Sequence, residues 1–356
     1  MKRAVPENLN AHPSVFAVED RYEIITPFGV SAVVWVKVGD KKYYDDSNGI
    51  LKSGNYVHKV AVPMCDLDKA GEYTLCYRKM IDRKPYFPES EEPVELSYKF
   101  KPVTGDRINI YHISDAHNFE EEPISAGSYF GEALDLLVLN GDIPNHSGDI
   151  ANFNSIYRIA SGLTEGTRPV VFSRGNHDTR GIYGESFGEY TPNNHGVPYY
   201  TFTLGSLWGL VLDCGEDKTD DHAEYGYTTC FHEFRLRETE FIKEVIEKRE
   251  YEGKKHKVVI CHVPFCYIQK PPFDIEQDLY REWTRMIGES IKPEIMLFGH
   301  THRNGIFYPG GELDSYGLQS SVAIVGGQPD FEKKTYEGCA ITLSEKEPEI
   351  VFTKNC

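Results

Sequence analysis

The chain has 356 residues, of which 40% are hydrophobic, and its formal net charge is −17. This length suits two domains with substantial cores, and no apolar run is long enough to predict a membrane span. The acidic balance argues against nucleic acid as a main partner, because phosphate backbones are held by basic surfaces. A small phosphorylated substrate stays possible, because a bound metal can create a local positive site within an acidic protein.

Cysteine usage and the amino terminus both favour a reducing, cytoplasmic setting. The amino terminus is basic but has no apolar segment behind it, so we expect no secretory signal. None of the cysteines shows metal-finger spacing, and Cys261 and Cys266 are too far apart for a CxxC motif. We expect reduced, mostly buried thiols. The eight cysteines are Cys65, Cys76, Cys214, Cys230, Cys261, Cys266, Cys339 and Cys356.

The first hundred residues have the pattern of an all-β domain. Short runs rich in β-branched and aromatic residues alternate with turn signals. The predicted strands cover residues 22–25, 31–38, 56–62, 73–78 and 94–100. Residues 67–73 resemble the tyrosine-corner turn of immunoglobulin-like and fibronectin-like domains. We therefore predict a small antiparallel β-sandwich over residues 1–104, without the inter-sheet disulfide of antibody domains.

After a linker at residues 101–106 the pattern changes to alternating strands and helices, which is typical of an α/β domain. We predict this second domain over residues 105–356. Its expected strands cover 107–114, 134–139, 169–172, 257–261, 294–298, 322–325, 339–343 and 349–353. A hairpin is expected at 199–204 and 207–213, and helices at 149–163, 235–251 and 275–291.

Chemically active side chains follow five of these strands directly. In open α/β sheets the carboxyl ends of strands present ligand-binding groups, and alternation along a strand would put both members of an Asp-x-His or His-x-His pair on one face. Any single block could be a hydrogen-bonded loop, but five such blocks in this order indicate a converging set of metal ligands. The blocks are Asp115 and His117; Asp142; Asn176, His177 and Asp178; His262; and His300 and His302.

These five blocks resemble the signature of the calcineurin-like metallophosphoesterases over roughly residues 107–353. The resemblance implies a four-layer αββα sandwich with two divalent metal ions at one sheet edge. It implies that the first metal is bound by Asp115, His117, His302 and Asp142. It implies that the second is bound by Asp142, Asn176, His262 and His300, with Asp142 bridging the two.

The implied reaction is hydrolysis of a phosphomonoester or phosphodiester by in-line attack of a hydroxide that bridges the metals. His177 is expected to stabilise the transition state or protonate the leaving group, and Asp178 to orient His177. Imidazole, amide and carboxylate ligands without thiolate favour Mn, Fe or Zn.

A β-sandwich before such a domain also resembles the architecture of purple acid phosphatases. Two positions differ from those enzymes: Asn145 stands where they have a tyrosine, and His117 supplies a histidine that they lack. We therefore expect an ordinary dinuclear site without a tyrosinate–iron(III) centre.

Substrate contacts are less well defined. Arg174 and Arg180 could clamp a phosphate, since guanidinium groups match its oxygens, but they could equally form salt bridges with acidic neighbours. His195 lies in a loop that could rim the site. His112, within a strand, is expected to be a packed core residue. Two other functions stay open: a nuclease, disfavoured by charge, and a binding scaffold that keeps the fold without turnover.

Overall fold

The computed structural model describes residues 3–355. Met1, Lys2 and Cys356 lie outside the described residues, so the basic start of the chain and the eighth cysteine are not placed. The seven cysteines within the described part are all free thiols. Within the same part, no helix combines the length and the apolar character that crossing a membrane requires.

The largest element is a nine-stranded mixed sheet in the order β20-β21-β11-β12-β13-β1-β2-β7, with β22 paired to β21. Its three central strands run parallel, with Leu137 opposite Val170 and Ile110 opposite Leu136. The strands are β1 (Ser14–Val18), β2 (Arg21–Pro27), β7 (Val57–Pro63), β11 (Ile108–Ile113), β12 (Leu136–Asn140), β13 (Pro169–Ser173), β20 (Gln328–Asp330), β21 (Thr335–Leu343) and β22 (Glu349–Lys354).

A second sheet of six strands faces the first in the order β14-β15-β16-β17-β19-β18. The predicted hairpin is confirmed, since β14 and β15 pair antiparallel. From β15 to β17 and on to β19 the neighbours are parallel. The strands are β14 (Tyr200–Leu204), β15 (Leu207–Val211), β16 (His256–Ile260), β17 (Ile295–Phe298), β18 (Gly305–Phe307) and β19 (Val322–Val325).

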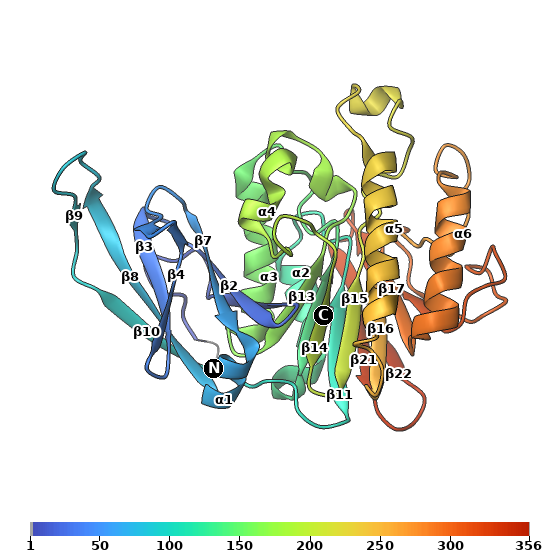
Figure 1. The fold of residues 1–356 in the computed structure, drawn as a ribbon, viewed down its shortest axis with the longest axis horizontal. Helices are drawn as coiled ribbons and strands as arrows, with labels where there is room; N and C mark the ends of the chain where they lie inside the picture. The colour runs from blue at the N-terminus through green and yellow to red at the C-terminus, as the bar shows by residue number, and fades with distance from the viewer. Residues whose placement is uncertain (1–2, 356) are drawn as a thin grey trace.

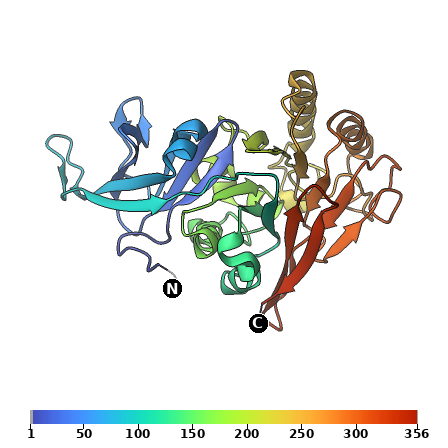
Figure 2. The same cartoon turned by 90° about the horizontal axis from the view of Figure 1, so that it is seen from below.

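Helices cover the outer faces of both sheets and complete four layers (Figure 1). One buried cluster joins α3 to the nine-stranded sheet, a second fills the space between the sheets, and a third joins α5 and α6 to the six-stranded sheet. Figure 2 shows the green helices on one side of the sheets and the gold and brown helices on the other. The α-helices are α1 (Met64–Ala70), α2 (Glu121–Gly127), α3 (Asn154–Thr164), α4 (Phe187–Tyr190), α5 (Phe231–Lys248) and α6 (Gln277–Met286).

Shorter helical turns connect these elements. They are η1 (Ser128–Ala133), η2 (Ile150–Phe153), η3 (His177–Thr179), η4 (Ile182–Ser186), η5 (Ala223–Tyr225) and the π-turn η6 (Ile287–Ile291), which extends α6.

The amino-terminal strands are divided among three sheets, the smallest of which is the pair β5 and β6. One sheet has the order β10-β8-β3-β4, with β9 paired to β8, and appears in blue and cyan on the left of Figure 1. Strands β1, β2 and β7 instead extend the nine-stranded sheet, because β1 pairs in parallel with β13. The separate sandwich and its boundary at residue 104 stay predictions, and the sheet runs across that boundary. The remaining strands are β3 (Ala32–Val38), β4 (Lys41–Tyr44), β5 (Asp46–Ser47), β6 (Ile50–Leu51), β8 (Glu72–Asp82), β9 (Glu89–Ser90) and β10 (Val94–Lys99).

The predicted tyrosine corner is wrong. A tyrosine corner bonds its hydroxyl to backbone a few residues upstream, whereas the hydroxyl of Tyr73 donates to the carbonyl of Gly166, 3.0 Å away beyond α3. Residues 64–70, just before it, form α1, which ends at Gly71 in the left-handed conformation with φ of 63°. Tyr73 therefore ties the amino-terminal sheet to the large one and does not close a local turn.

Candidate metal centre

The five blocks that follow the predicted strands meet at one edge of the two sheets, beyond the carboxyl ends of β11, β12, β13, β16 and β17. Asp115, His117 and His302 form one group with ligand atoms within 4.8 Å of one another. In it, the Nε2 atoms of His117 and His302 are 3.0 Å apart. The Nε2 of His302 is 3.4 Å from Oδ1 of Asp115.

Asp142, His262 and His300 form a second group with the same spacing. The Nε2 of His262 is 3.1 Å from Oδ2 of Asp142. The same Oδ2 is 3.9 Å from Nε2 of His117, so this carboxylate lies between the two groups. Asn176 joins the second group through its Oδ1, which is 3.0 Å from Nδ1 of His300. All seven predicted ligands thus lie together.

The predicted ligands do not meet by alternation of side chains along a strand, as we had expected for the Asp-x-His and His-x-His pairs. Strand β11 ends at Ile113 and β17 at Phe298, so neither His-containing pair lies on a strand. Five of the residues instead have left-handed backbone, which L-residues adopt at a cost of about 1–3 kcal/mol each and which clusters at functional sites. They are Asp115, His117, Asp142, His300 and His302, with φ between 44° and 67°.

Two glycines let the ligand loops approach closely. A Cβ on Gly175 would lie 2.3 Å from Oδ1 of Asp142, and a Cβ on Gly141 would lie 2.5 Å from Cγ of His262. Gly141 also has a φ of 78°. The glycine before Asn176 is therefore required by space, and the glycine before Asp142 by space and by conformation.

The donor set fits divalent cations. Nδ1 of His262 is 2.7 Å from the carbonyl oxygen of Asn140, which can only accept, so Nδ1 carries a proton. Its other nitrogen, Nε2, is buried without a hydrogen-bond partner and faces the carboxylates of Asp142 and Asp115. A histidine held by a carbonyl on one nitrogen and free on the other is the usual arrangement of a metal ligand.

The electrostatics of this edge also call for bound cations. Asp115 and Asp142 are almost completely buried, and buried anions are costly unless they are paired. Burial opposes a charge on His262, but Asp142 and Asp115 outweigh it and raise the pKa of His262 to about 10. Burial lowers the pKa of His117 and of His300 to about 4. Histidines that stay neutral beside buried carboxylates provide the lone pairs that a metal ion needs.

His177 borders this cluster and lies within ligand distance of it, since its ring forms a third group with His117 and Asp142 whose ligand atoms are within 4.8 Å of one another. Its ring is 4.7 Å from the ring of His117. Its backbone N–H donates to Oδ1 of Asp142 at 2.8 Å. Nδ1 of the ring is 2.9 Å from the carbonyl of Asn145 and therefore donates, while Nε2 accepts from Nη1 of Arg180 at 3.2 Å.

We predicted that Asp178 orients the ring of His177, but the structure does not place its side chain against that ring. Oδ2 of Asp178 accepts from the backbone N–H of Gly175 at 2.7 Å and of Asp142 at 3.2 Å. The two side chains diverge because residues 177–179 form a 3-10 turn. Asp178 therefore holds the loop that carries Asp142, and the contacts that orient His177 come from Asn145 and Arg180.

The three predicted substrate contacts separate in the structure. Arg174 turns away from the cluster, with Nε 2.6 Å from Oδ2 of Asp213 and its guanidinium over Phe231 and Phe234. Arg180 reaches His177 and is held by both oxygens of Glu216 at 2.8 and 2.9 Å. His195 is exposed in a turn, with a φ of 51°, and is not brought to the cluster.

Sequence reasoning missed two buried residues that support the ligands. Ser114 donates to Asp115 Oδ2 at 2.6 Å or to the carbonyl of Asn140 at 2.8 Å. The side-chain amide of Asn140 is 3.0 Å from Nε2 of His112, a fully buried histidine as expected. Both residues immediately precede a predicted block, and polar residues at the ends of apolar strands were the available signal.

A cavity of about 680 Å³ opens over the cluster. Asp142, Asn176, His177, His300 and His302 form its floor, and residues from the loop after β16 form part of its wall. The wall residues from that loop are Tyr267, Gln269, Lys270 and Phe273.

The model of the family described as calcineurin-like phosphoesterase matches residues 108–304, more than half of the chain. The chain belongs to the calcineurin-like phosphoesterases. The match covers all five blocks. Membership in this family, together with the clusters of histidine and aspartate, indicates a metal-dependent phosphoesterase.

Two solved structures share the fold of this calcineurin-like phosphoesterase. The purple acid phosphatase PPD1 from yellow lupin (Lupinus luteus) aligns with a TM-score of 0.61 at 12% identity, covering 97% of this chain and 72% of that one. A structure of PhoD aligns with a TM-score of 0.53 at 11% identity, covering 99% and 90%. A search of curated proteins finds no match.

Proposed function

We propose that this protein hydrolyses a phosphomonoester or phosphodiester with two divalent metal ions bound at the cluster. The observation that carries the proposal is that all seven expected ligands lie together at one sheet edge, with no ligand position lost. Asp115, His117 and His302 would hold one ion. Asn176, His262 and His300 would hold the other, and Asp142 would bridge them.

Two such ions would supply a water-derived nucleophile at neutral pH and positive charge for the phosphoryl oxygens. The histidine, amide and carboxylate donors suit Mn, Fe or Zn.

The side chains around the ligands would complete the reaction. His177 borders the cavity, and its Nε2 would donate to a phosphoryl or leaving-group oxygen once the ring is doubly protonated and Nε2 has released Arg180, from which it now accepts. Arg180, at 3.2 Å from that nitrogen, is itself paired with Glu216, Asp217 and Glu224, so its part would be to position the ring. The carbonyl of Asn145 fixes the proton on Nδ1, so the ring presents Nε2 to the cavity.

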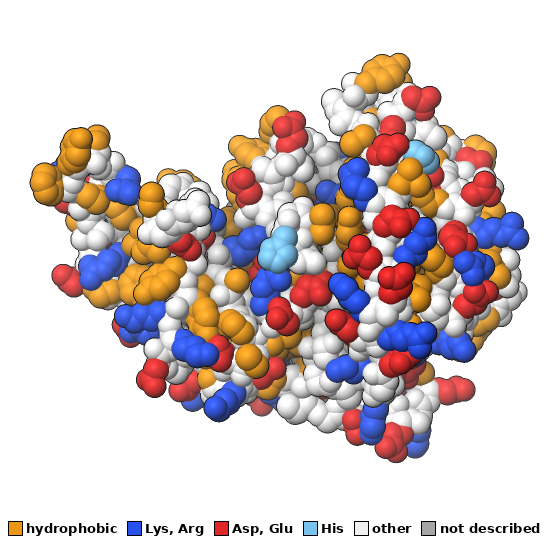
Figure 3. Space-filling view, viewed as in Figure 1, with side chains coloured by type: hydrophobic (Ala, Val, Ile, Leu, Met, Phe, Trp, Pro, Cys, Tyr) orange, Lys and Arg blue, Asp and Glu red, His pale blue; other side chains and the backbone are white. Residues whose placement is uncertain are grey.

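The two other candidate functions are less well supported. A nuclease would need a basic surface for a phosphate backbone, but the net charge is −17, and acidic and basic side chains are interspersed over α5 in Figure 3. A binding scaffold would tolerate loss of ligands, whereas every ligand position and His177 are filled. A small phosphorylated substrate therefore fits better than either alternative.

An Asp142→Asn variant tests the proposal. Wild-type protein loaded with Mn²⁺, Fe²⁺ or Zn²⁺ should release phosphate or alcohol from a panel of mono-, di- and pyrophosphate esters. Removing a residue that supports a metal ligand usually lowers activity roughly 10–100-fold. Because Asp142 would itself be a ligand, we expect Asp142→Asn to lower the rate of ester hydrolysis by more than that. The matched control is Asp45→Asn, because Asp45 is equally buried but pairs with His58 at 2.7 Å, in the amino-terminal part.

The outcomes separate the alternatives. Turnover that survives in Asp142→Asn at the wild-type level would show that the site is misassigned. A wild-type protein that binds two metal ions but hydrolyses no ester would favour the scaffold.

A further inference from the structure

Phe331 is an exposed apolar residue beside the candidate metal centre. It follows β20 in the tight turn before β21, where polar residues and glycine are usual, and 49% of its surface is exposed. Its ring centroid is 5.9 Å from that of His117 and 6.5 Å from that of His302. A second aromatic ring, Phe119, lies 5.1 Å from it and is half-buried.

The turn that carries Phe331 is fixed to the framework of the metal centre. Strands β20 and β21 pair from Gln328 opposite Glu337 to Asp330 opposite Thr335. Just before β20, a Cβ on Gly327 would lie 2.4 Å from the carbonyl oxygen of Ser114 and 2.9 Å from Oδ2 of Asp115. The backbone therefore passes directly behind a predicted ligand, and the position of Phe331 is set by the same strands that set Asp115.

The position of Phe331 suits contact with a substrate. Its ring touches His302, which lines the cavity. The turn contributes no buried core, and Phe331, although its ring packs against Phe119 and His117, leaves about half of its surface open to a ligand. Lys270, from the loop after β16, lines the cavity, and its ammonium group forms no hydrogen bond or ion pair with any described residue. The phosphate would be bound at the metals, leaving the two phenyl rings to contact the organic group.

We propose that Phe331 and Phe119 form an aromatic subsite for the organic part of the substrate. The preferred phosphate ester then carries a flat aromatic or otherwise apolar group. This inference rests on the proposed function, because it assumes that the phosphate is bound at the metal centre. Aromatic rings attract one another edge to face or offset at centroid distances of 4.5–7 Å, the range in which these two already lie.

Binding of non-hydrolysable ligands tests the subsite apart from catalysis. We would titrate the Mn²⁺-loaded protein with benzylphosphonate and with ethylphosphonate and take the ratio of the two dissociation constants. In the wild type, benzylphosphonate should bind roughly 10-fold more tightly, since ring contacts add to buried area. Phe331→Ala should bring the ratio close to one, and Phe331→Tyr should restore it.

The matched control is Phe87→Ala, because Phe87 is 88% exposed at the tip of the hairpin between β8 and β9, away from the cavity. Its variant should keep the wild-type ratio. A wild-type ratio near one, a ratio that Phe331→Ala leaves unchanged, or no binding of either phosphonate would overturn the subsite.

Turnover of benzyl phosphate and ethyl phosphate, measured alongside, keeps the two proposals distinct. A selective ratio without hydrolysis of any ester would reject the proposed function and keep the subsite. Hydrolysis of both esters, with a ratio of the two dissociation constants near one, would keep the proposed function and reject the subsite.

Discussion

Strand β16 has a buried histidine at each end, and their surroundings differ. His256 begins the strand and is 4% exposed, while His262 follows its carboxyl end and is 1% exposed. Both ring nitrogens of His256 have partners: Nδ1 lies 2.7 Å from Glu294 and Nε2 lies 2.8 Å from the carbonyl of Asp106. Only one nitrogen of His262 has such a partner, and the other faces Asp142.

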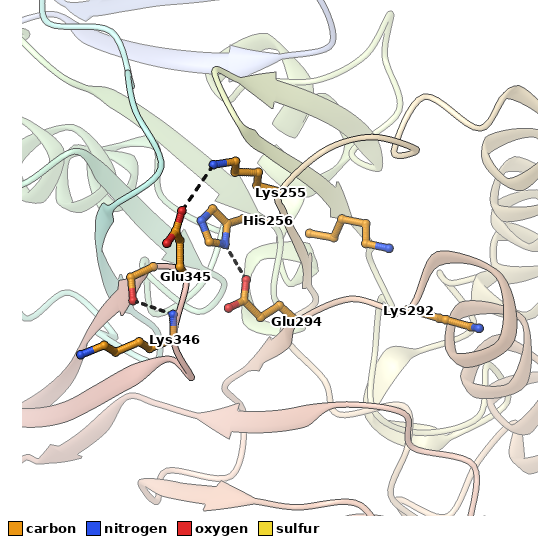
Figure 4. Close-up of a pocket in the computed structure, with 8 residues that line it drawn as sticks. Lys255, His256, Lys292, Glu294, Glu345 and Lys346 are labelled. Atoms are coloured by element: carbon orange, nitrogen blue, oxygen red, sulfur yellow. Dashed lines mark hydrogen bonds and ion pairs between the residues drawn. The ribbon is translucent and has the colours of Figure 1, made fainter.

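The charged residues around the two histidines also differ. At the amino-terminal end of β16, a hollow of about 430 Å³ is lined by charged residues, some of which pair with one another (Figure 4). Lys255, for example, is 3.9 Å from Glu345. At the carboxyl end, two buried aspartates raise the pKa of His262 to about 10, while burial keeps His117 and His300 neutral. Lys292 and Lys346, which have no acidic partner in the hollow, are exposed and can be solvated, whereas Asp115 and Asp142 are buried and need positive charge beside them. The comparison therefore locates function at one end of the sheets.

Replacing each histidine in turn is the strongest way to test this comparison. We expect His262→Ala to lose one of two bound metal ions and more than about 100-fold of kcat, because a ligand should cost more than its supporting partner. His256→Ala should keep both ions and its kcat. It should lose about 1–3 kcal/mol of stability, because Glu294 and a backbone carbonyl lose their partner. Metal analysis, kinetics and urea denaturation give the three readouts, and equal metal content in both variants would contradict the comparison.

His177 should show the next largest effect. Although it lies within ligand distance of His117 and Asp142, both of its ring nitrogens have protein partners, so His177→Ala should retain both metal ions. Its kcat should fall about 10²–10⁴-fold, the usual contribution of a positioned acid or base. Elemental analysis of the purified variant is the control. A variant that had lost metal would show that His177 is a ligand and would overturn the role proposed for it.

Variants of Asp178 show whether this residue supports a loop or orients His177. Its Oδ2 accepts two backbone N–H groups, and an asparagine side chain can accept both through its carbonyl. We expect Asp178→Ala to lose about 10–100-fold of kcat, and Asp178→Asn to stay much closer to the wild type. If Asp178→Asn lost as much as His177→Ala, the carboxylate charge would matter, and orientation of His177 by Asp178 would again be the better explanation.

The sequence predicted the set of ligands well because their convergence follows from topology. Parallel strands end at one sheet edge, so Asp142 and Asn176, which follow neighbouring strands, have to meet there. Apolar runs also predicted the long strands and α5. The pairing of β1 with β13 could not be predicted, because it joins residues that are more than 150 positions apart in sequence, and no local pattern encodes such a partner.

Side-chain direction was the other limit. Arg174 and Arg180 have the same chemistry and similar positions in the sequence, yet one pairs with Asp213 and the other reaches His177. The left-handed backbone of Asp115 and His117 likewise depends on the glycines and loops that surround them, not on their own residue types. Phe331 lies in a turn far from any predicted block, so only the structure connects it with the metal centre.

Glu238 also has a buried side-chain atom without a hydrogen-bond partner, but the reason differs from that for His262. It is fully buried on α5, and its Oε2 has no hydrogen-bond partner, as is the case for Nε2 of His262. Its Oε1 accepts from the backbone N–H of Asp213 at 2.7 Å. Burial, and then the charge of Asp213, raise the pKa of Glu238 well above its usual value. Burial therefore favours the protonated form of this carboxyl group, and we expect a proton and not a metal ion to neutralise it.

The sign of the pH effect follows from the direction of that shift. A raised pKa in the folded state contributes stability that is complete below the unfolded pKa, near 4.5, and is lost as pH rises through the folded pKa. Glu238→Gln keeps the neutral form and the acceptor at every pH. We therefore expect Glu238→Gln to match the wild type near pH 4.5 and to exceed it at pH 8 by about 1 kcal/mol or more, since one pKa unit corresponds to about 1.4 kcal/mol. Urea denaturation at the two pH values measures this difference.

Glu240→Gln is the control on the same helix, because Glu240 is exposed and pairs with Lys243. A Glu238→Gln variant whose advantage did not grow with pH would mean that Glu238 is charged in the folded protein and needs a cation.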